Sequence, residues 1–386
     1  MKHGWEYKKF TDVCDVQYGF AFDSKFFTDD ENAMPLIRIR DVMRGYSETF
    51  YNGEIPNGYL INEGDYLVGM DGEFNIGRWG KRPGLLNQRV CKMSSSSKLL
   101  DNQYMYYFMK VCLKSIEDET PFVTVKHLSA KRINLIEIPL PPLLTQQSIA
   151  SELDKINKLI RLKKEQLKDY DNLAQSIFYE MFGDPIENEK GWEVKKLSSI
   201  TSKIGSGATP KGGNESYKTE GISLIRSLNV HNNEFLYKDL AHIDNEQAEA
   251  LSNVEIKECD VLLNITGASV ARCCIVPDDV IPARVNQHVC IVRTIQEKAL
   301  PIFINRVLTN ENFQANLLRL ARSKAATREA LPKSIVDNIQ VPLPPLSLQQ
   351  LFAQRIELIE QQKAEIKSTI ADLETLLASR MQYWFD

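Results

Sequence analysis

The sequence predicts an α+β fold in which two mixed, β-rich domains, related by an internal repeat, are joined by two long antiparallel coiled-coil helices. Three observations support this prediction. The segment "IPLPPLLTQQSIASELDKI", which begins at Ile138, returns as "VPLPPLSLQQLFAQRIELI" from Val341, and nine of the 19 aligned positions are identical. Shorter motifs return in the same order before each copy, and an apolar heptad pattern follows each copy. A repeat of this length sets the organisation of the chain before any single element is assigned.

Length and composition are those of a globular protein with more than one domain. The 386 residues are 43% hydrophobic and 25% charged, and the net charge of −4 does not mark the chain as a polyanion binder. No run of 18 apolar residues could span a membrane, and the first residues, "MKHGWEYKKF", lack the apolar core of a signal peptide. The seven cysteines form no CxxC pair, which favours reduced thiols in a cytoplasmic protein.

The repeat extends over the whole chain. Its paired landmarks are Gly4-Trp5-Glu6 and Gly191-Trp192-Glu193, Leu36-Ile37-Arg38 and Leu224-Ile225-Arg226, Asp65 with Gly72 and Asp260 with Gly267, Asn87-Gln88 and Asn286-Gln287, and Leu128 and Leu331. The order of landmarks never changes, although the offset between copies drifts. We therefore expect a first domain at 1–137, a Pro-rich segment with a helix at 138–184, a second domain at 185–340, and a second Pro-rich segment with a helix at 341–386.

Both Pro-rich segments precede a helix with an apolar seam that repeats in steps of four and three residues. Thr145 or Ser347 is a plausible N-cap for each helix. Lys163, Lys363 and Arg380 interrupt the seams, and we expect the lysine ammonium groups to reach out to solvent past their packed stems. The residues expected to pair the helices are Ile149, Leu153, Ile156, Ile160, Leu167, Tyr170 and Ile177 in the first, and Phe352, Ile356, Ile359, Ile366, Ile370, Leu373, Leu377 and Trp384 in the second.

The two seams are expected to pack against each other, because either one alone would leave an apolar stripe in water. Each globular domain precedes its own helix, so a parallel pair would crowd both domains at one end. An antiparallel pair is therefore expected, with Lys363 near Tyr170. The domains themselves contain short β-rich segments such as "PLIRIRDV" and "DVLLNI", and helical stretches near 103–116 and 302–321.

The sequence contains no motif of a catalytic centre. The Gly-rich segment "GSGATPKGGN" from Gly205 lacks the Lys-Ser/Thr of a phosphate-binding loop. No HExxH, GxSxG or GxGxxG motif occurs, and the five histidines and the cysteines show no metal-ligand spacing. We therefore expect a chain that is not an enzyme and that holds no metal or cofactor of its own.

Positive charge is clustered despite the negative net charge. Basic residues gather in 72–98, 124–132 and 319–333, whereas 231–260 is acidic. Each cluster alone could be an ordinary solvated loop, but similar clusters in both copies favour contact with DNA, since Arg, Asn and Gln can read purine edges. The candidate contacts are Asn75, Arg78, Trp79, Lys81, Arg82, Arg89, Lys126 and His127 in the first copy, and Ser206, Thr209, Lys211, Asn264, Thr266, Ser269, Arg272, Arg322, Lys324 and Arg328 in the second.

Two globular repeats, each followed by "PLPPL", "QQ" and a heptad helix, resemble the specificity subunit of type I restriction–modification enzymes, a bacterial defence system. The resemblance covers essentially the whole chain. It implies two target recognition domains that each read one half of a split DNA sequence, and helices that act as a spacer and dock two methyltransferase subunits, with restriction (translocase–nuclease) subunits joining that core. It also implies a non-catalytic chain whose partner subunits use S-adenosylmethionine, ATP and Mg.

A second interpretation stays open on the residues alone. A coiled-coil scaffold protein with two β-rich partner-binding domains and no DNA role would show the same repeat and the same seams. The uneven basic segments favour a double-stranded DNA ligand, and binding whose affinity falls with salt would distinguish the two.

Overall fold

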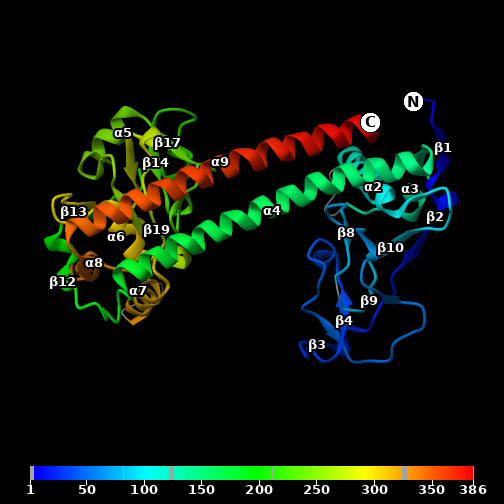
Figure 1. Ribbon diagram of the computed structural model, residues 1–386, viewed down its shortest axis with the longest axis horizontal. Coiled ribbons are helices and arrows are strands. Elements are labelled where there is room, and N and C mark those ends of the chain that lie inside the picture. The colour runs from blue at the N-terminus through cyan, green and yellow to red at the C-terminus, as the bar shows by residue number, and fades with distance from the viewer. Residues whose placement is uncertain (1–3, 81, 121–125, 211, 324–328, 386) are drawn as a thin grey trace. The chain divides into compact units, whose positions relative to one another are not determined.

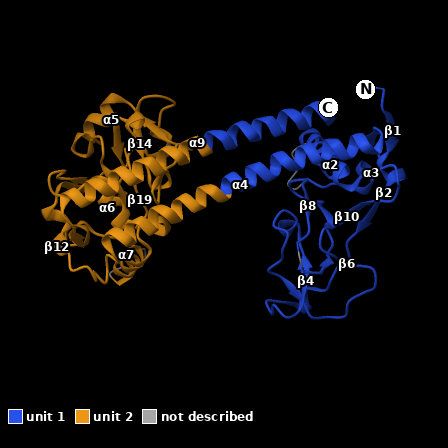
Figure 2. Cartoon of the chain, in the orientation of Figure 1, with its two compact units in different colours: residues 1–164, 367–386 blue, residues 165–366 orange. Residues whose placement is uncertain are grey.

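A computed structural model describes residues 4–80, 82–120, 126–210, 212–323 and 329–385 (Figure 1). The chain divides into two units, residues 1–164 with 367–386, and residues 165–366 (Figure 2). Each unit contains one β-rich part together with portions of both long helices. Among the described residues, no helix is long and apolar enough to cross a membrane, and no group of three or more His, Cys, Asp or Glu side chains could hold a metal ion.

The described residues of the first unit build three sheets, with strand orders β1-β11, β2-β10-β7-β8 and β3-β5-β4-β9-β6. Its strands are β1 Glu6–Lys9, β2 Cys14–Tyr18, β3 Phe27–Thr28, β4 Met34–Ile37, β5 Phe50–Tyr51, β6 Leu60–Ile61, β7 Tyr66–Gly69, β8 Ile76–Arg78, β9 Gly84–Leu86, β10 Val90–Ser95 and β11 Glu137–Leu140. Its helices are α1 Phe10–Val13, α2 Asn102–Glu119, α3 Ala130–Ile133 and the first part of α4 Leu143–Phe182.

In the part of the second unit that the structure describes there are four sheets, β12-β22, β13-β21-β18-β19, β17-β14-β20 and β15-β16. Its strands are β12 Glu193–Lys196, β13 Thr201–Ser206, β14 Ile222–Ile225, β15 Val230–His231, β16 Glu234–Phe235, β17 Ala241–Ile243, β18 Val261–Asn264, β19 Cys273–Ile275, β20 Ala283–Val285, β21 Val289–Thr294 and β22 Gln340–Leu343. Its helices are α5 Asn245–Ala250, α6 Pro301–Leu308, α7 Glu311–Ser323, α8 Lys333–Asp337 and the first part of α9 Leu346–Phe385.

The same topology occurs in both units, which confirms the internal repeat at the level of strand pairing. The order β2-β10-β7-β8 corresponds to β13-β21-β18-β19, and the parallel pair β4–β9 corresponds to β14–β20. The repeated Gly-Trp-Glu and Pro-rich motifs are hydrogen-bonded neighbours, because β1 pairs with β11 and β12 pairs with β22, both antiparallel. Two motifs far apart in the sequence thus recur together because they form one small sheet.

The Pro-rich segments each end in a glutamine that is completely buried. Gln146 donates to the carbonyls of Leu99 and Pro141, each at 2.8 Å, and accepts a bond from the backbone N–H of Asp101, the N-cap of α2, at 2.9 Å. In the second unit Gln349 accepts from the N–H of Leu300, the N-cap of α6, at 2.9 Å. The first Gln of each "QQ" therefore ties the start of a long helix to the start of a domain helix.

Both long helices begin before the residues expected to cap them. α4 begins at Leu143 and α9 at Leu346, so Thr145 and Ser347 lie in the first turn and the N-cap prediction was wrong. Pro142 accepts the N–H of Thr145 at 2.8 Å. Proline at the start of a helix has a suitable fixed φ and lacks an N–H that would have no partner there, which explains the earlier start.

In each unit the two long helices pack side by side and run in opposite directions (Figure 1). In the first unit Arg380 pairs with Glu152, and Lys164 lies 2.7 Å from Glu374. In the second, Lys363 lies 2.8 Å from Asp171, and the rings of Phe178 and Phe352 are 5.8 Å apart. Partner numbers fall along α9 as they rise along α4, so the helices are antiparallel, as the sequence predicts.

The expected seam residues are all at least half-buried. The buried ones are Ile149, Leu153, Ile156, Ile160, Phe352, Ile356, Ile359, Ile366 and Ile370, and the half-buried ones are Leu167, Tyr170, Ile177, Leu373, Leu377 and Trp384. Lys363 differs from expectation. It is only 8% exposed, and its ammonium group bonds to Asp171 and, at 3.1 Å, to Glu360 rather than reaching out to solvent.

Candidate nucleic-acid interface

In the first unit, three separate segments meet at the tip of the β7–β8 hairpin. The N–H of Met70 donates to the carbonyl of Arg89 at 2.9 Å, and the N–H of Leu128 donates to the carbonyl of Met70 at 2.7 Å. The N–H of Gly72 donates to the carbonyl of Lys126 at 2.9 Å. We call residues 70–72, 87–89 and 126–128 the first junction. These backbone bonds hold neighbouring side chains from three segments at one place.

The second unit repeats this arrangement bond for bond at the tip of the β18–β19 hairpin. The N–H of Ile265 donates to the carbonyl of His288 at 2.9 Å, and the N–H of Leu331 donates to the carbonyl of Ile265 at 2.8 Å. The N–H of Gly267 donates to the carbonyl of Glu329 at 3.0 Å. Residues 265–267, 286–288 and 329–331 form the second junction, which contains the repeated Asn-Gln motif.

A glycine loop lies against each junction so closely that no side chain fits. A Cβ atom on Gly19 would lie 2.0 Å from the carbonyl oxygen of Asn87, and one on Gly207 would lie 1.7 Å from that of Val285. The N–H of Gly207 donates to the carbonyl of Asn286 at 3.1 Å. These contacts bring the predicted "GSGATPKGGN" segment next to the second junction.

The first junction gathers charged side chains. His127 Nδ1 lies 2.5 Å from Asp71 Oδ1, and Arg89 Nε lies 3.4 Å from the other carboxylate oxygen of Asp71. The Arg89 and His127 side chains are 55% and 46% exposed, whereas Asp71 is 20% exposed. Asn75, whose carbonyl accepts from the N–H of Gly69, lies at the other end of the same hairpin tip. The structure thus brings together Arg89 and His127 and adds Asp71, which sequence reasoning missed, whereas the amide oxygen of Asn75 is buried.

The second junction carries a chain of mostly neutral groups. Thr266 Oγ1 lies 2.5 Å from His288 Nδ1, and His288 Nε2 lies 3.1 Å from the amide nitrogen of Gln287. The hydroxyl of Thr209 donates to the amide oxygen of Gln287. Arg272 occupies the place of Asn75 on the hairpin, because the N–H of Asn264 donates to its carbonyl as Gly69 donates to that of Asn75. His288 and Gln287 were not among the predicted residues, although the repeated "NQ" motif marked their position.

In each unit a junction residue forms an ion pair with the domain helix, and the positions of acid and base are exchanged between the two units. Lys126 Nζ donates to the carbonyl of Glu117 at 2.6 Å and lies 3.9 Å from its carboxylate. At the corresponding place, Arg322 Nε lies 2.7 Å from Glu329. The domain helix supplies the acid in the first unit and the base in the second.

Several predicted residues lie away from the junctions or inside the protein. Arg78 is exposed at the far end of β8, and Arg82 donates to backbone carbonyls of the 31–33 loop. Trp79 is buried, and its indole N–H donates to the carbonyl of Arg82 at 2.6 Å. Asn264 is completely buried and donates to the carbonyl of Ser227 at 2.9 Å. A direct contact of Trp79 or Asn264 with DNA would require these side chains to leave the core.

Of the other candidates, Ser206 is exposed and Ser269 half-buried, both near the second junction. Four predicted positions, Lys81, Lys211, Lys324 and Arg328, lie outside the described residues.

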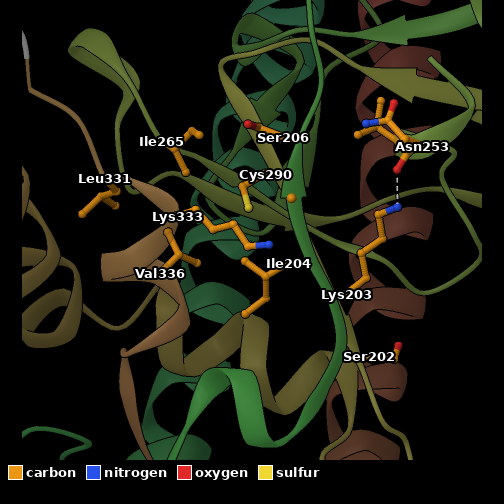
Figure 3. A pocket seen from close by; sticks show the side chains of 12 residues that line it. Ser202, Lys203, Ile204, Ser206, Asn253, Ile265, Cys290, Leu331, Lys333 and Val336 are labelled. Atoms are coloured by element: carbon orange, nitrogen blue, oxygen red, sulfur yellow. Dashed lines mark hydrogen bonds between the residues drawn. The ribbon is translucent and has the colours of Figure 1, made fainter. Parts of the chain in front are cut away.

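Ser206 also lines a hollow of about 540 Å³ in the second unit, between β13 and α8 (Figure 3). Lys203 at its rim donates to the carbonyl of Asn253, and Lys333 reaches in beside Ile204 and Cys290. Burial raises the pKa of Cys290 to about 12, so its thiol stays protonated at neutral pH and is no nucleophile. Burial likewise raises the pKa of the other cysteines, Cys14, Cys91, Cys112, Cys259, Cys273 and Cys274, all of which are free.

Comparison with known proteins identifies the repeat. A family model described as type I restriction modification DNA specificity domain matches twice, at residues 2–169 and 189–375. The type I restriction enzyme EcoBI specificity subunit of Escherichia coli is 30% identical over 373 residues, 89% of this chain and 77% of its own length. The MjaVIII specificity subunit of Methanocaldococcus jannaschii is 24% identical over 318 residues, 78% of this chain and 73% of its own length.

Solved structures agree on the fold. A crystal structure of the type I restriction–modification S subunit from M. genitalium aligns over 100% of this chain and 97% of its own, with a TM-score of 0.58 and 14% identity. A chain from a structural study of assembly and conformational transition of the type I system aligns over 99% and 97%, with a TM-score of 0.59 and 16% identity. The doubled family match and the E. coli relative show that this chain belongs to the family of type I restriction–modification specificity subunits.

Proposed function

We propose that this chain is the sequence-specificity subunit of a type I restriction–modification complex and reads a bipartite DNA target, one half-site per β-rich domain. One observation of the structure carries the proposal. Both units hold the same backbone junction, yet the polar side chains on it differ, with Asp71, Arg89 and His127 in one and Thr266 and His288 in the other. Two copies of one frame that present different polar groups suit a protein that reads two different sequences.

The recognition domains are proposed to be residues 1–137 and 185–340, and the helical spacers 138–184 and 341–386. Within the domains, we propose that junction residues meet base edges. Exposed cations away from the junctions, such as Arg78, are suited to phosphates, which set affinity and orientation rather than sequence. The candidate set keeps Asn75, Arg89, Lys126 and His127 in the first domain and Thr209, Thr266, Arg272 and Arg322 in the second.

The chain itself is non-catalytic, in agreement with its place among specificity subunits. Two methyltransferase subunits are proposed to dock on the long helices, and restriction subunits to join that assembly in the cytoplasm. Exposed leucines on the helices are the proposed docking surface, since large contiguous apolar patches often mark protein interaction sites. They are Leu143, Leu144, Leu159, Leu162 and Leu173 on α4, and Leu351, Leu358 and Leu376 on α9. S-adenosylmethionine, ATP and Mg would be held by the partner subunits and none by this chain.

The proposal is tested by exchanging one domain. Residues 185–338 are replaced by the matching region of a relative, and the methylated sites in cells carrying the complex are mapped. We expect one half of a bipartite motif to change while the other half stays. The reciprocal exchange of residues 1–137 is the matched control and should change the other half. A motif that changes in both halves, or no motif at all for the parent complex, would contradict the assignment.

Salt dependence distinguishes DNA recognition from the scaffold interpretation. Binding of a target duplex by the complete methyltransferase complex is measured over a series of salt concentrations. A specific complex should bind its target more tightly than a scrambled duplex at every salt concentration, with affinity falling steeply as counterions compete. Affinity that is equal for both duplexes would favour the scaffold interpretation.

A further inference from the structure

The repeat allows one copy of the chain to be compared with the other at positions held by the same backbone bonds. Three positions stand out because the frame is shared and the side chains are not. They are Asp71 and Thr266, Arg89 and His288, and His127 and Ala330. We infer that these positions determine which base each domain reads, with Arg89 reading a guanine and Asp71 acting as its positioning residue. This inference rests on the proposed function and deepens it.

The frame does not depend on these side chains. The bonds that join the three segments run from backbone to backbone, and the residues between the variable positions are apolar and buried, Met70 and Leu128 in the first unit and Ile265 and Leu331 in the second. The isolated bridge between residues 71 and 127 recurs between residues 266 and 330. Side chains at residues 71 and 127 can therefore be exchanged while the backbone bonds stay in place. Arg89 shares its backbone bond with His288, but only Arg89 of the two has a positive φ, 71°.

In the first junction the geometry prepares an arginine for base contact. The Asp71 carboxylate holds His127 through one oxygen and Arg89 through the other. The contact with Arg89 is at Nε, on the side edge of the guanidinium, and so leaves the end edge formed by the two terminal nitrogens to other partners. A guanidinium with a free terminal edge can donate two parallel bonds to the O6 and N7 atoms of guanine. Holding it in place lowers the entropy lost when those bonds form.

The second junction cannot make that contact at the same position. His288 stands where Arg89 does, and both of its ring nitrogens already contact protein atoms, Thr266 on one side and Gln287 on the other. Ala330 replaces His127 and offers no polar group. Arg272, a cation of this unit, lies on the hairpin instead. The two half-sites are therefore expected to differ at the base pair that faces Arg89.

The test uses the assembled methyltransferase complex and its mapped target. Affinity is measured for the target and for duplexes that carry single base-pair changes across the half-site of the first domain. Arg89→His places the residue of the second junction in the first. Arg89→Asn is the second variant, because Arg89 has a φ of 71° and Asn tolerates that conformation well. Asp71→Asn tests positioning, and Arg44→His, at an exposed arginine paired with Glu48 outside the junction, is the control.

Both Arg89 variants should reduce discrimination at one guanine position by about 5- to 100-fold, the value expected for loss of one bidentate base contact. Asp71→Asn should reduce discrimination at that same position by a smaller factor, and Arg44→His should leave every position unchanged. Equal weakening at all positions with a flatter salt dependence would make Arg89 a phosphate contact and overturn the inference. A parent complex that fails to discriminate any position would instead overturn the proposed function.

Discussion

Replacing Gln146 by leucine should destabilise the first unit far more than its place in a polar "QQ" pair would suggest. Gln146 is completely buried, whereas the next residue, Gln147, is exposed. The Gln146 amide bonds to the carbonyls of Leu99 and Pro141 and to the N–H of Asp101. The last bond satisfies the backbone N–H of Asp101, the N-cap residue of α2. In many helices the acceptor for this N–H is the side chain of the helix's own third residue, whereas here the acceptor is the Gln146 side chain of α4. Leucine keeps the volume and removes all three bonds.

The expected cost follows from what is left unpaired. Gln146→Leu leaves the buried carbonyl of Pro141 without its amide donor, and an unsatisfied buried polar group costs about 1–3 kcal/mol. The other two bonds are partly accessible to water, so their loss adds less, and leucine regains some energy through apolar burial. The sum is about 2–4 kcal/mol. Gln147→Leu, an identical chemical change one residue away, should stay within about 0.5 kcal/mol of the parent chain.

Native-state hydrogen exchange is the suitable measurement, because a chain with two units need not unfold in one step. In Gln146→Leu, amides at the start of α2 should exchange roughly 30- to 700-fold faster, the factor that corresponds to about 2–4 kcal/mol. Amides of α6 in the second unit should not change. Gln349→Leu should have the opposite effect: amides at the start of α6 should exchange faster than in the parent chain, and exchange at α2 should not change. Equal exchange in Gln146→Leu and Gln147→Leu would refute the reasoning.

Two further outcomes concern the helix pair. Lys363→Met should leave the free energy of unfolding unchanged or raise it by about 1 kcal/mol. Asp171→Asn should lower it by about 1 kcal/mol, because the buried Lys363 ammonium group then loses one of its two carboxylate partners, Asp171 and Glu360. Urea unfolding of the two variants measures both changes. Hydrogen bonds from Arg380 and then Trp384 hold the pKa of Glu152 below its usual 4.5, so its stabilising effect is present above that pH and disappears as pH falls. Glu152→Gln should therefore melt at a lower temperature than the parent near neutral pH, and the two melting temperatures should converge in acid.

The sequence predicted the architecture because the repeat and the seams are redundant signals. Heptad spacing over two 40-residue helices leaves one plausible partner for each seam, and the order of domain and helix selects the antiparallel pair. Helix starts were harder, since Thr145 and Ser347 are good N-cap residues in isolation. The fixed φ of Pro142 and Pro345 already suits the start of a helix, so the helices begin directly after these prolines. The N-cap preference of Thr145 and Ser347 therefore does not decide where the helices start.

Candidate site residues were only partly predictable. Basic side chains in one stretch of sequence, such as Arg78, Arg82 and Arg89, fall at different places because a strand carries its ends apart and its faces alternate. Trp79, within that stretch, belongs to the core. Asp71 was missed because an acid is an unexpected neighbour in a DNA-binding surface, and its role appears only when His127 arrives from 56 residues away. Such a contact forms only when two segments far apart in the sequence fold against each other, and no short sequence pattern predicts it.

The two copies also show which part of each unit is free to vary. The junction bonds, the buried glutamines and the strand orders recur with nearly the same geometry, and all of them involve backbone groups or buried side chains. The charged side chains near the junctions differ. The Lys126–Glu117 pair of the first unit corresponds to the Glu329–Arg322 pair of the second, with the signs exchanged. Exchanging the acid and the base of such an ion pair should change the free energy of unfolding little, but it places the opposite charge beside the junction. We expect variation of this kind to change what the surface recognises and to leave the fold intact, so that a whole domain could be exchanged without rebuilding the helix that follows it.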